Sequence, residues 1–210
     1  MYNGVQLNFE DYIMSRARSF DRDKAIEKTI NTIWQSGFDN FSVKGFSEEI
    51  GINRSSFYHA FKNKDALFTE ALDRYFKESP HYKLANFAKV KSPLKLLTQV
   101  FRETCLARTS DPDHRGCMAV NCVTELVGVN QVLGPMIADA VRYSIANFEA
   151  LLNDSVQKKE LPGKTDTHSL ALAIQNLLMG LNVMSKVITN ERELWDATKV
   201  GLVALNIYRV

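Results

Sequence analysis

Between residues 42 and 64 the sequence carries hydroxyl, imidazole and cationic side chains that suit an anionic polymer. They are Ser42, Lys44, Arg54, Ser55, Ser56, Tyr58, His59 and Lys64. Hydroxyl and ammonium groups bind phosphate oxygens, and a guanidinium can pair with the edge of a base. The bulk charge gives no such indication, because residues 1–70 hold nine Lys and Arg against ten Asp and Glu. The attraction must come from placement: residues 41–64 hold four cations and two anions, and we expect the anions, Glu48 and Glu49, to face away from the polymer.

Two short helices are expected to position these side chains. The first has Ser42 as its N-cap and runs to about Ile50, and the second runs from Asn53 to about His59. The turn between them contains Gly51, as in a helix-turn-helix, whose second helix enters the major groove of DNA. The residues expected to face the core are Phe46, Ile50, Ile52, Phe57 and Phe61.

The run SVKGFSEEIGINRSSFYHAFKNKDAL at residues 42–67 resembles the DNA-binding signature of the TetR family of repressors. Its most characteristic parts are Tyr58-x-x-Phe61 and Lys64-Asp65-x-Leu67. The sequence departs from the family pattern at two positions. Gly45 lies in a helix interior, where glycine costs about 1 kcal/mol. Ser47 stands where a smaller alanine is common.

The resemblance implies a role for each polar residue of the motif. Phosphate contacts are expected from Ser42, Tyr58 and Lys64. Base contacts are expected from Arg54, Ser55 and Ser56, at the exposed start of the recognition helix. Lys44 and His59 can reach either the backbone or the bases. The alternative is that all of these are ordinary solvated residues, with Tyr58 half-buried in a helical bundle.

Helical periodicity continues through the rest of the chain, and no segment alternates as a strand would. The expected fold is all-α, with about nine helices. A flexible arm (residues 1–20) precedes a helix-turn-helix three-helix bundle with a fourth helix (residues 21–79), followed by a helical regulatory and dimerisation domain (residues 80–210). Later helices are expected from Pro93, over 131–159, over 166–189 and over 192–208.

One recognition helix makes few contacts, so a homodimer on a pseudo-palindromic double-stranded DNA operator is expected. The resemblance implies that the last two helices pair with their mates. Candidate stripes are Leu170, Ile174, Leu177, Leu181 and Met184 on one helix and Trp195, Thr198, Leu202 and Leu205 on the other. The alternative is that both stripes pack the core of the monomer.

The resemblance also implies that the middle helices enclose a pocket for a small-molecule inducer. Candidate ligand-binding residues are Phe87, Phe101, Cys105, Met118, Cys122, Tyr143, Phe148 and Met179. Cys117 follows Arg115-Gly116 at a helix start, where the helix dipole and a nearby cation lower the pKa of a thiol. It resembles an Arg-Gly-Cys stretch in a subgroup of the family, some of whose members respond to electrophiles or oxidants. The alternative is a small buried residue.

No metal site or cofactor is expected. Asp111, Asp113, His114 and Cys117 lie close in sequence, but Asp-Pro-Asp is a common turn and Cys122 diverges from Cys117 on a helix. The four histidines form no catalytic pattern, so an all-helical enzyme and a constitutive DNA-binding protein without a sensor are the rival functions. Three cysteines, no signal sequence and no membrane span favour the cytoplasm. The function expected is a repressor released from its operator by an inducer.

Overall fold

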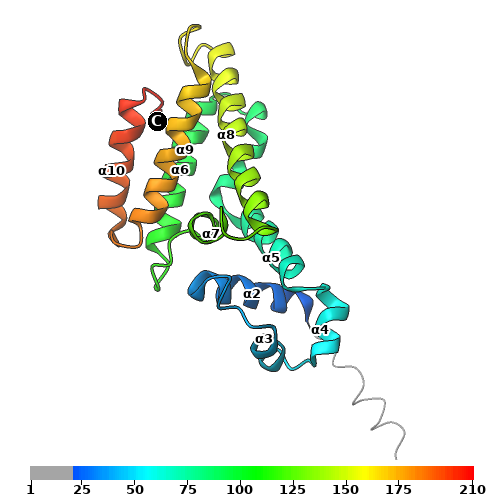
Figure 1. Cartoon of the computed structure of the whole chain (residues 1–210). Helices are drawn as coiled ribbons and strands as arrows, with labels where there is room; N and C mark the ends of the chain where they lie inside the picture. Colours follow the sequence, from blue (N-terminus) through cyan, green and yellow to red (C-terminus); the bar gives the residue numbers. More distant parts are fainter. Residues whose placement is uncertain (1–20) are drawn as a thin grey trace, which may run out of the picture.

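The computed structural model describes residues 21–210, and within this range all regular structure is helical (Figure 1). The helices are α2 (Arg22–Ser36), α3 (Val43–Glu49), α4 (Arg54–Phe61), α5 (Lys64–Glu78), α6 (Pro93–Thr109), α7 (Met118–Leu126), α8 (Leu133–Gln157), α9 (Thr167–Met184) and α10 (Glu191–Ala204). A 3₁₀ segment, η1 (Pro80–Lys89), joins α5 to α6. The all-α prediction is confirmed, whereas the arm expected at residues 1–20 lies outside the described residues.

Polar caps define where most of these helices begin. In α3, α4 and α5 the side chains of Ser42, Asn53 and Asn63 each accept a hydrogen bond from the backbone N–H three residues later. Two predicted ends were wrong. α9 stops at Met184 and α10 at Ala204, and in both cases the apolar pattern continues into the turn that follows.

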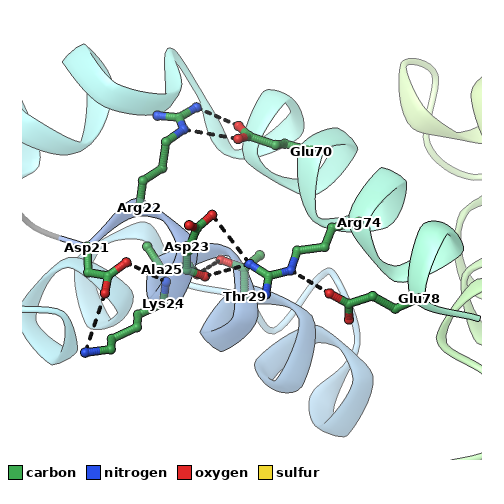
Figure 2. A network of polar contacts seen from close by, with 9 residues as sticks. All are labelled: Asp21, Arg22, Asp23, Lys24, Ala25, Thr29, Glu70, Arg74 and Glu78. Atoms are coloured by element: carbon green, nitrogen blue, oxygen red, sulfur yellow. Dashed lines mark hydrogen bonds and ion pairs between the residues drawn. The ribbon is translucent and has the colours of Figure 1, made fainter.

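Ion pairs hold α2 against α5 (Figure 2). Arg22 forms a two-pronged contact with Glu70, with nitrogen–oxygen distances of 3.1 and 2.6 Å. Arg74 bonds to Glu78 at 2.9 Å and donates to the backbone carbonyl of Asp23 at 3.1 Å. These contacts hold together α2 and α5, the two helices that flank α3 and α4 in the chain.

The buried side chains form two clusters. The first, the N-terminal cluster, joins α2–α5 to α7 and the first turns of α8, through Cys117, Met118, Cys122, Leu126, Leu133 and Ile137. The second, the C-terminal cluster, combines η1, α6, the rest of α8, α9 and α10. In Figure 1, α2–α4 lie at one end of the molecule, α9 and α10 at the other, and α7 between them. Glu125 of α7 also accepts a hydrogen bond from the backbone of Asp39 at 3.0 Å, so α7 is tied to the α2–α3 connection.

Candidate DNA-binding face and ligand cavity

The helix-turn-helix is formed by α3 and α4, and the aromatic residues between them set its geometry. Phe46 of α3 meets Phe57 of α4 edge-to-face, with ring centroids 6.1 Å apart, and Phe57 packs on Phe61 at 5.5 Å. All three rings are buried, and Ile50 and Ile52 pack against them half-buried. The inward-facing residues expected from the sequence therefore do form the core, which leaves the opposite face of α4 free.

Seven of the eight residues expected at the DNA-binding face are exposed. They are Ser42, Lys44, Arg54, Ser55, Ser56, Tyr58 and His59. Lys64 is different: it is half-buried, and its ammonium lies 4.0 Å from the centre of the Phe38 ring. Burial holds the pKa of Lys64 below its usual value, against the opposing effect of nearby carboxylates. Its charge is therefore anchored at the edge of the face.

The two anions of the motif have different surroundings. Glu49 pairs with Lys28 of α2 at 2.5 Å, so its carboxylate is directed away from α4, as expected. Glu48 instead lies in a hollow between α3 and α4 that Lys44 and Arg54 also line. Glu48 thus lies beside two of the proposed DNA-contacting cations, whereas Glu49 does not. The reason is that successive helical residues are turned about 100° from each other.

A cavity of about 310 Å³ lies where the two buried clusters meet. Tyr75, Cys117 and Ile137 line it from the N-terminal cluster, and Leu84 and Leu178 from the C-terminal cluster. The other apolar lining residues come mainly from α7 and α8, including Ala119, Val120, Val123, Ala140 and Val141. A volume of this size is within the range of small-molecule sites in proteins.

One cluster of polar side chains in the cavity wall contains a buried cation, Arg108. Arg108 of α6 is only 6% exposed, and its Nε donates to Oδ1 of Asn182 at 2.6 Å. The hydroxyl of Tyr75 accepts from the backbone N–H of Met118 at 3.2 Å and donates to Sγ of Cys117 at 3.4 Å. Burial raises the pKa of Tyr75 well above its usual range, so it stays a neutral donor.

A second cluster of polar side chains in the wall, Ser144, Gln175 and His81, is uncharged. The single hydroxyl proton of Ser144 goes to Oε1 of Gln175 at 2.7 Å, so Nε2 of His81, 3.3 Å away, must carry the proton shared with Ser144. Nδ1 of His81 is then a bare acceptor, and it is buried without a partner among the described residues. Burial lowers the pKa of His81 to about 4, which keeps its ring neutral.

The cavity wall differs from the set expected from the sequence. Tyr143 and Met179 line it, whereas Phe87, Phe101, Cys105, Met118, Cys122 and Phe148 do not. All six of these pack within or against the two clusters. The reason is that an aromatic or sulfur side chain on the inner face of a helix usually fills the core.

Arg108, Gln175 and Asn182 are polar wall residues that the sequence could have indicated. The buried face of α6 contains Leu94, Leu97, Phe101 and Cys105, and Arg108 is the next position of that three-four pattern. Gln175 and Asn182 continue the buried face of α9 in the same way. A polar residue that continues an apolar stripe is a signal of a polar group inside the fold.

Most of the expected dimer stripes face the core of the monomer. Ile174, Leu181, Trp195, Thr198 and Leu202 are buried there, while Leu170, Leu177 and Leu205 are half-buried and Met184 is exposed. A different apolar face, formed by α9, the turn after it and α10, is exposed, with Leu172, Val183, Met184, Val187, Val200 and Val203. The stripes were misplaced because α9 is apolar on both sides.

The loop that raised the question of a metal site is held by an ion pair. Both carboxylate oxygens of Asp111 accept from the Arg115 side chain, at 2.9 to 3.2 Å. Burial acts to raise the pKa of Asp111, but the hydrogen bonds from Arg115 outweigh it and hold the pKa below the usual value. Within residues 21–210 no three His, Cys, Asp or Glu side chains converge as metal ligands would. In that range, too, no helix is long and apolar enough to cross a bilayer.

A helix-turn-helix with an exposed polar second helix, attached to a helical body with an internal cavity, defines a class of DNA-binding proteins. Family comparison gives the same class. Residues 25–71 match the family model described as bacterial regulatory proteins, tetR family, and residues 93–200 match a tetracyclin repressor-like C-terminal domain. The chain therefore belongs to the TetR family of DNA-binding transcriptional repressors.

Individual relatives agree with this assignment. The HTH-type transcriptional repressor ComR of Escherichia coli (strain K12) is 24% identical over 172 residues, which are 81% of this chain and 82% of that protein. A cysteine-substituted form of the TetR family transcriptional regulator CifR, solved with 26-bp operator DNA, superposes with a TM-score of 0.80 at 26% identity, covering 90% of this chain and 98% of that one. Reduced E. coli NemR has the same fold, with a TM-score of 0.70 at 18% identity, covering 88% of this chain and 94% of that one.

Proposed function

We propose that this chain is a homodimeric repressor that leaves a pseudo-palindromic operator when an inducer occupies the cavity between its two buried clusters. The observation that carries the proposal is the position of this cavity. Tyr75 in its wall belongs to α5, which also packs against α2 of the DNA-binding part. A ligand there can change how that part sits on the helical body. It releases DNA only if it binds the DNA-free arrangement more tightly.

DNA contact is assigned to the exposed face of α3 and α4. Lys44 and Arg54 make no ion pair among the described residues, so their charges are available to DNA. Arg54, Ser55 and Ser56 occupy the first turn of α4 and are proposed to read base edges. Ser42, Tyr58 and Lys64 are proposed to bind phosphates, with Lys44 and His59 beside them.

Binding titrations on a defined operator test this assignment. The operator is first located by footprinting upstream of the chain's own gene. Arg54→Ala should relax the preference at one base pair by about 1–3 kcal/mol. Lys64→Ala should weaken all sequences about equally and lower the salt dependence of binding. Lys95→Ala, which removes an exposed lysine from α6, is the matched control. Unchanged affinity for every duplex in both test variants would refute the assignment.

The dimer is proposed to form through the exposed apolar face of α9 and α10. Val183, Val187, Val200 and Val203 are each about half exposed or more, and the exposed Gly180 has nothing within 4 Å of the position of a Cβ. Such a face permits close approach of a second copy, with the recognition helices about one turn of DNA apart, ~34 Å, or more. Val200→Glu should shift sedimentation toward the monomer while helicity is retained. A wild-type monomer at micromolar concentration would contradict the proposal.

Cys117 is a second candidate trigger, because its thiol lies in the cavity wall and accepts the Tyr75 hydrogen bond. Addition of the S–H group across the double bond of N-ethylmaleimide would break this link between α5 and the start of α7. We expect such treatment, or mild oxidant, to release the operator from wild type and not from Cys117→Ser. Cys105→Ser is the matched control variant, since Cys105 is buried outside the cavity wall and burial raises the pKa of its thiol. If wild type and Cys117→Ser respond alike, Cys117 is not the trigger.

A further inference from the structure

The buried guanidinium of Arg108 lacks an anionic partner among the described residues. Its only hydrogen bond there is from Nε to the neutral Asn182 amide, and the two terminal nitrogens have none. Its guanidinium carbon also lies 5.9 Å from the centre of the Trp34 ring. A buried charge without a counter-ion is costly, and in proteins such charges are normally paired.

The nearby carboxylate of Asp111 is already paired with another cation, Arg115. Asp111 is buried and binds Arg115 through both oxygens. Arg115 also lies over Trp34, at 4.1 Å, so two guanidinium groups flank this ring. Asp113 lies 3.9 Å from Arg115 and forms no ion pair with Arg108. The charge of Arg108 is therefore left for a group that enters the cavity.

The rest of the wall indicates what such a group is attached to. Most of the exposed cavity surface is apolar, contributed by residues such as Val120, Val123 and Val141. The uncharged group around Gln175 lies seven residues before Asn182 on α9, a separation of two helical turns, or about 10 Å. The group around Arg108 is thus cationic, and the group two turns away is uncharged. Asp73 and Lys77 also line the cavity, but they form an ion pair with each other at 2.7 Å.

We propose that the cavity binds an organic monocarboxylate, with its carboxylate on the terminal nitrogens of Arg108 and an apolar body about two helical turns long against α7 and α8. A planar guanidinium with two free terminal nitrogens matches a carboxylate, which can accept two parallel hydrogen bonds. The amide of Asn182 orients the guanidinium, because its own N–H donates to the carbonyl of Leu178 at 2.7 Å and leaves Oδ1 for Arg108. This inference rests on the proposed function only in taking the cavity as the ligand site.

The test measures binding by calorimetry on the full-length protein, without DNA. The probes are octanoate and phenylbutanoate, each compared with the amide of the same length. We expect both acids to bind, with each amide at least about 10-fold weaker, because a charge-assisted pair is lost. Arg108→Gln should weaken acid binding roughly 10- to 100-fold and leave amide binding unchanged, which shows that the cavity itself is intact.

Two controls make the outcome specific. Arg102→Gln removes an exposed arginine from the same helix and should leave acid binding as in wild type. Equal binding of acid and amide, no binding of either acid, or unchanged acid binding in Arg108→Gln would each overturn the proposal. If Arg108→Gln instead slows alkylation of Cys117 with acid binding unchanged, the guanidinium serves the thiolate, which also overturns it.

Operator release is measured separately, by competition of the same acids against bound operator. Acids that bind through Arg108 without releasing DNA would refute the proposed induction by cavity occupancy and leave the carboxylate site intact. Release by neutral ligands alone would support the proposed function and overturn the carboxylate site. The two failures are therefore distinguishable.

Discussion

The two buried clusters of this repressor differ in composition and in how completely their polar groups are satisfied. The N-terminal cluster is rich in aromatic rings, with Phe46, Phe57, Phe61 and Phe68 at its centre. The C-terminal cluster is largely aliphatic. Its buried hydroxyls, such as those of Ser155 and Thr198, donate to backbone carbonyls one turn earlier. By contrast, the hydroxyl of Ser47 in α3 is buried without a partner among the described residues.

This division into two clusters indicates which parts of the molecule can move relative to each other. The cavity is walled by both clusters, and α7 belongs to the N-terminal cluster although it follows α6 in sequence. A ligand bound between the clusters, as proposed above, would act on their relative position, because each cluster is close-packed and resists internal change. The DNA-binding helices and α7 should therefore move together.

The largest expected effect tests whether the N-terminal cluster is one unit. Phe57 is fully buried, and Phe57→Ala should cost about 3–5 kcal/mol of the free energy of unfolding. Leu151→Ala, in the C-terminal cluster, is the counterpart and should cost about 2–5 kcal/mol. Both are measured by denaturant unfolding. Because α7 shares the first cluster, we expect Phe57→Ala to reduce hydrogen-exchange protection in α7 as well. Normal protection of α7 in that variant would contradict the division into clusters.

The next largest expected effect is on the pH dependence of stability. It concerns His81, which lines the cavity between the clusters and is kept neutral by burial. Its pKa in the folded protein is about 4, below the unfolded value of about 6.5. The contribution of His81 to the free energy of unfolding is complete above pH ~6.5. It is lost as the pH falls toward ~4, by at most about 1.4 kcal/mol per pH unit. His81→Gln should remove this slope in urea titrations between those values.

His168 is the control, since it is exposed and its hydrogen bond to Glu149 raises its pKa. Its contribution has the opposite sign, being present at low pH and lost as pH rises. His168→Gln should therefore leave the falling stability below pH ~6.5 in place. A slope that survives in His81→Gln and disappears in His168→Gln would reverse the assignment.

The DNA-binding face and the cavity also differ in how far the sequence predicts them. The face is built from one contiguous stretch, so local rules suffice: Ser42 and Asn53 cap their helices, and Phe57 and Phe61 turn inward. The cavity wall comes from α5, η1 and α6–α9, and no periodicity within one helix tells which inner residues leave a gap. Arg108 shows the difficulty, because its position on α6 predicts burial but not what lies opposite it.

Lys64 shows a limit even for the contiguous motif. The resemblance implied a phosphate contact, which stays a prediction; it did not indicate that the ammonium lies on the Phe38 ring, which comes from the connection after α2. This contact depends on how α5 packs against that connection. The dimer stripes fail for a related reason, because α9 offers two apolar faces and only tertiary packing decides which one is covered.

A smaller effect is expected from the unsatisfied hydroxyl of Ser47. Ser47→Ala should stabilise the protein by about 1 kcal/mol, because an unpaired buried polar group costs about 1–3 kcal/mol. Ser155→Ala in the C-terminal cluster should act in the opposite direction, by about 0.5–1.5 kcal/mol, since it removes a made hydrogen bond of 2.9 Å. Thermal midpoints of the two variants measure the contrast. Destabilisation in both would mean that the Ser47 hydroxyl is bound in solution.

The smallest effect lies in the same helix. Gly45 has no positive φ, and a Cβ there would meet only the Ser42 side chain, at 3.8 Å or more, an ordinary contact. Gly45→Ala should therefore stabilise α3 by up to about 1 kcal/mol, the propensity difference between the two residues. Gly51→Ala is the matched control in the turn, where φ is +74° and a side chain is strained by about 1–2 kcal/mol. Opposite shifts of the thermal midpoint are expected. If Gly45→Ala raises stability but weakens operator binding, the glycine is retained for close approach of α3 to DNA.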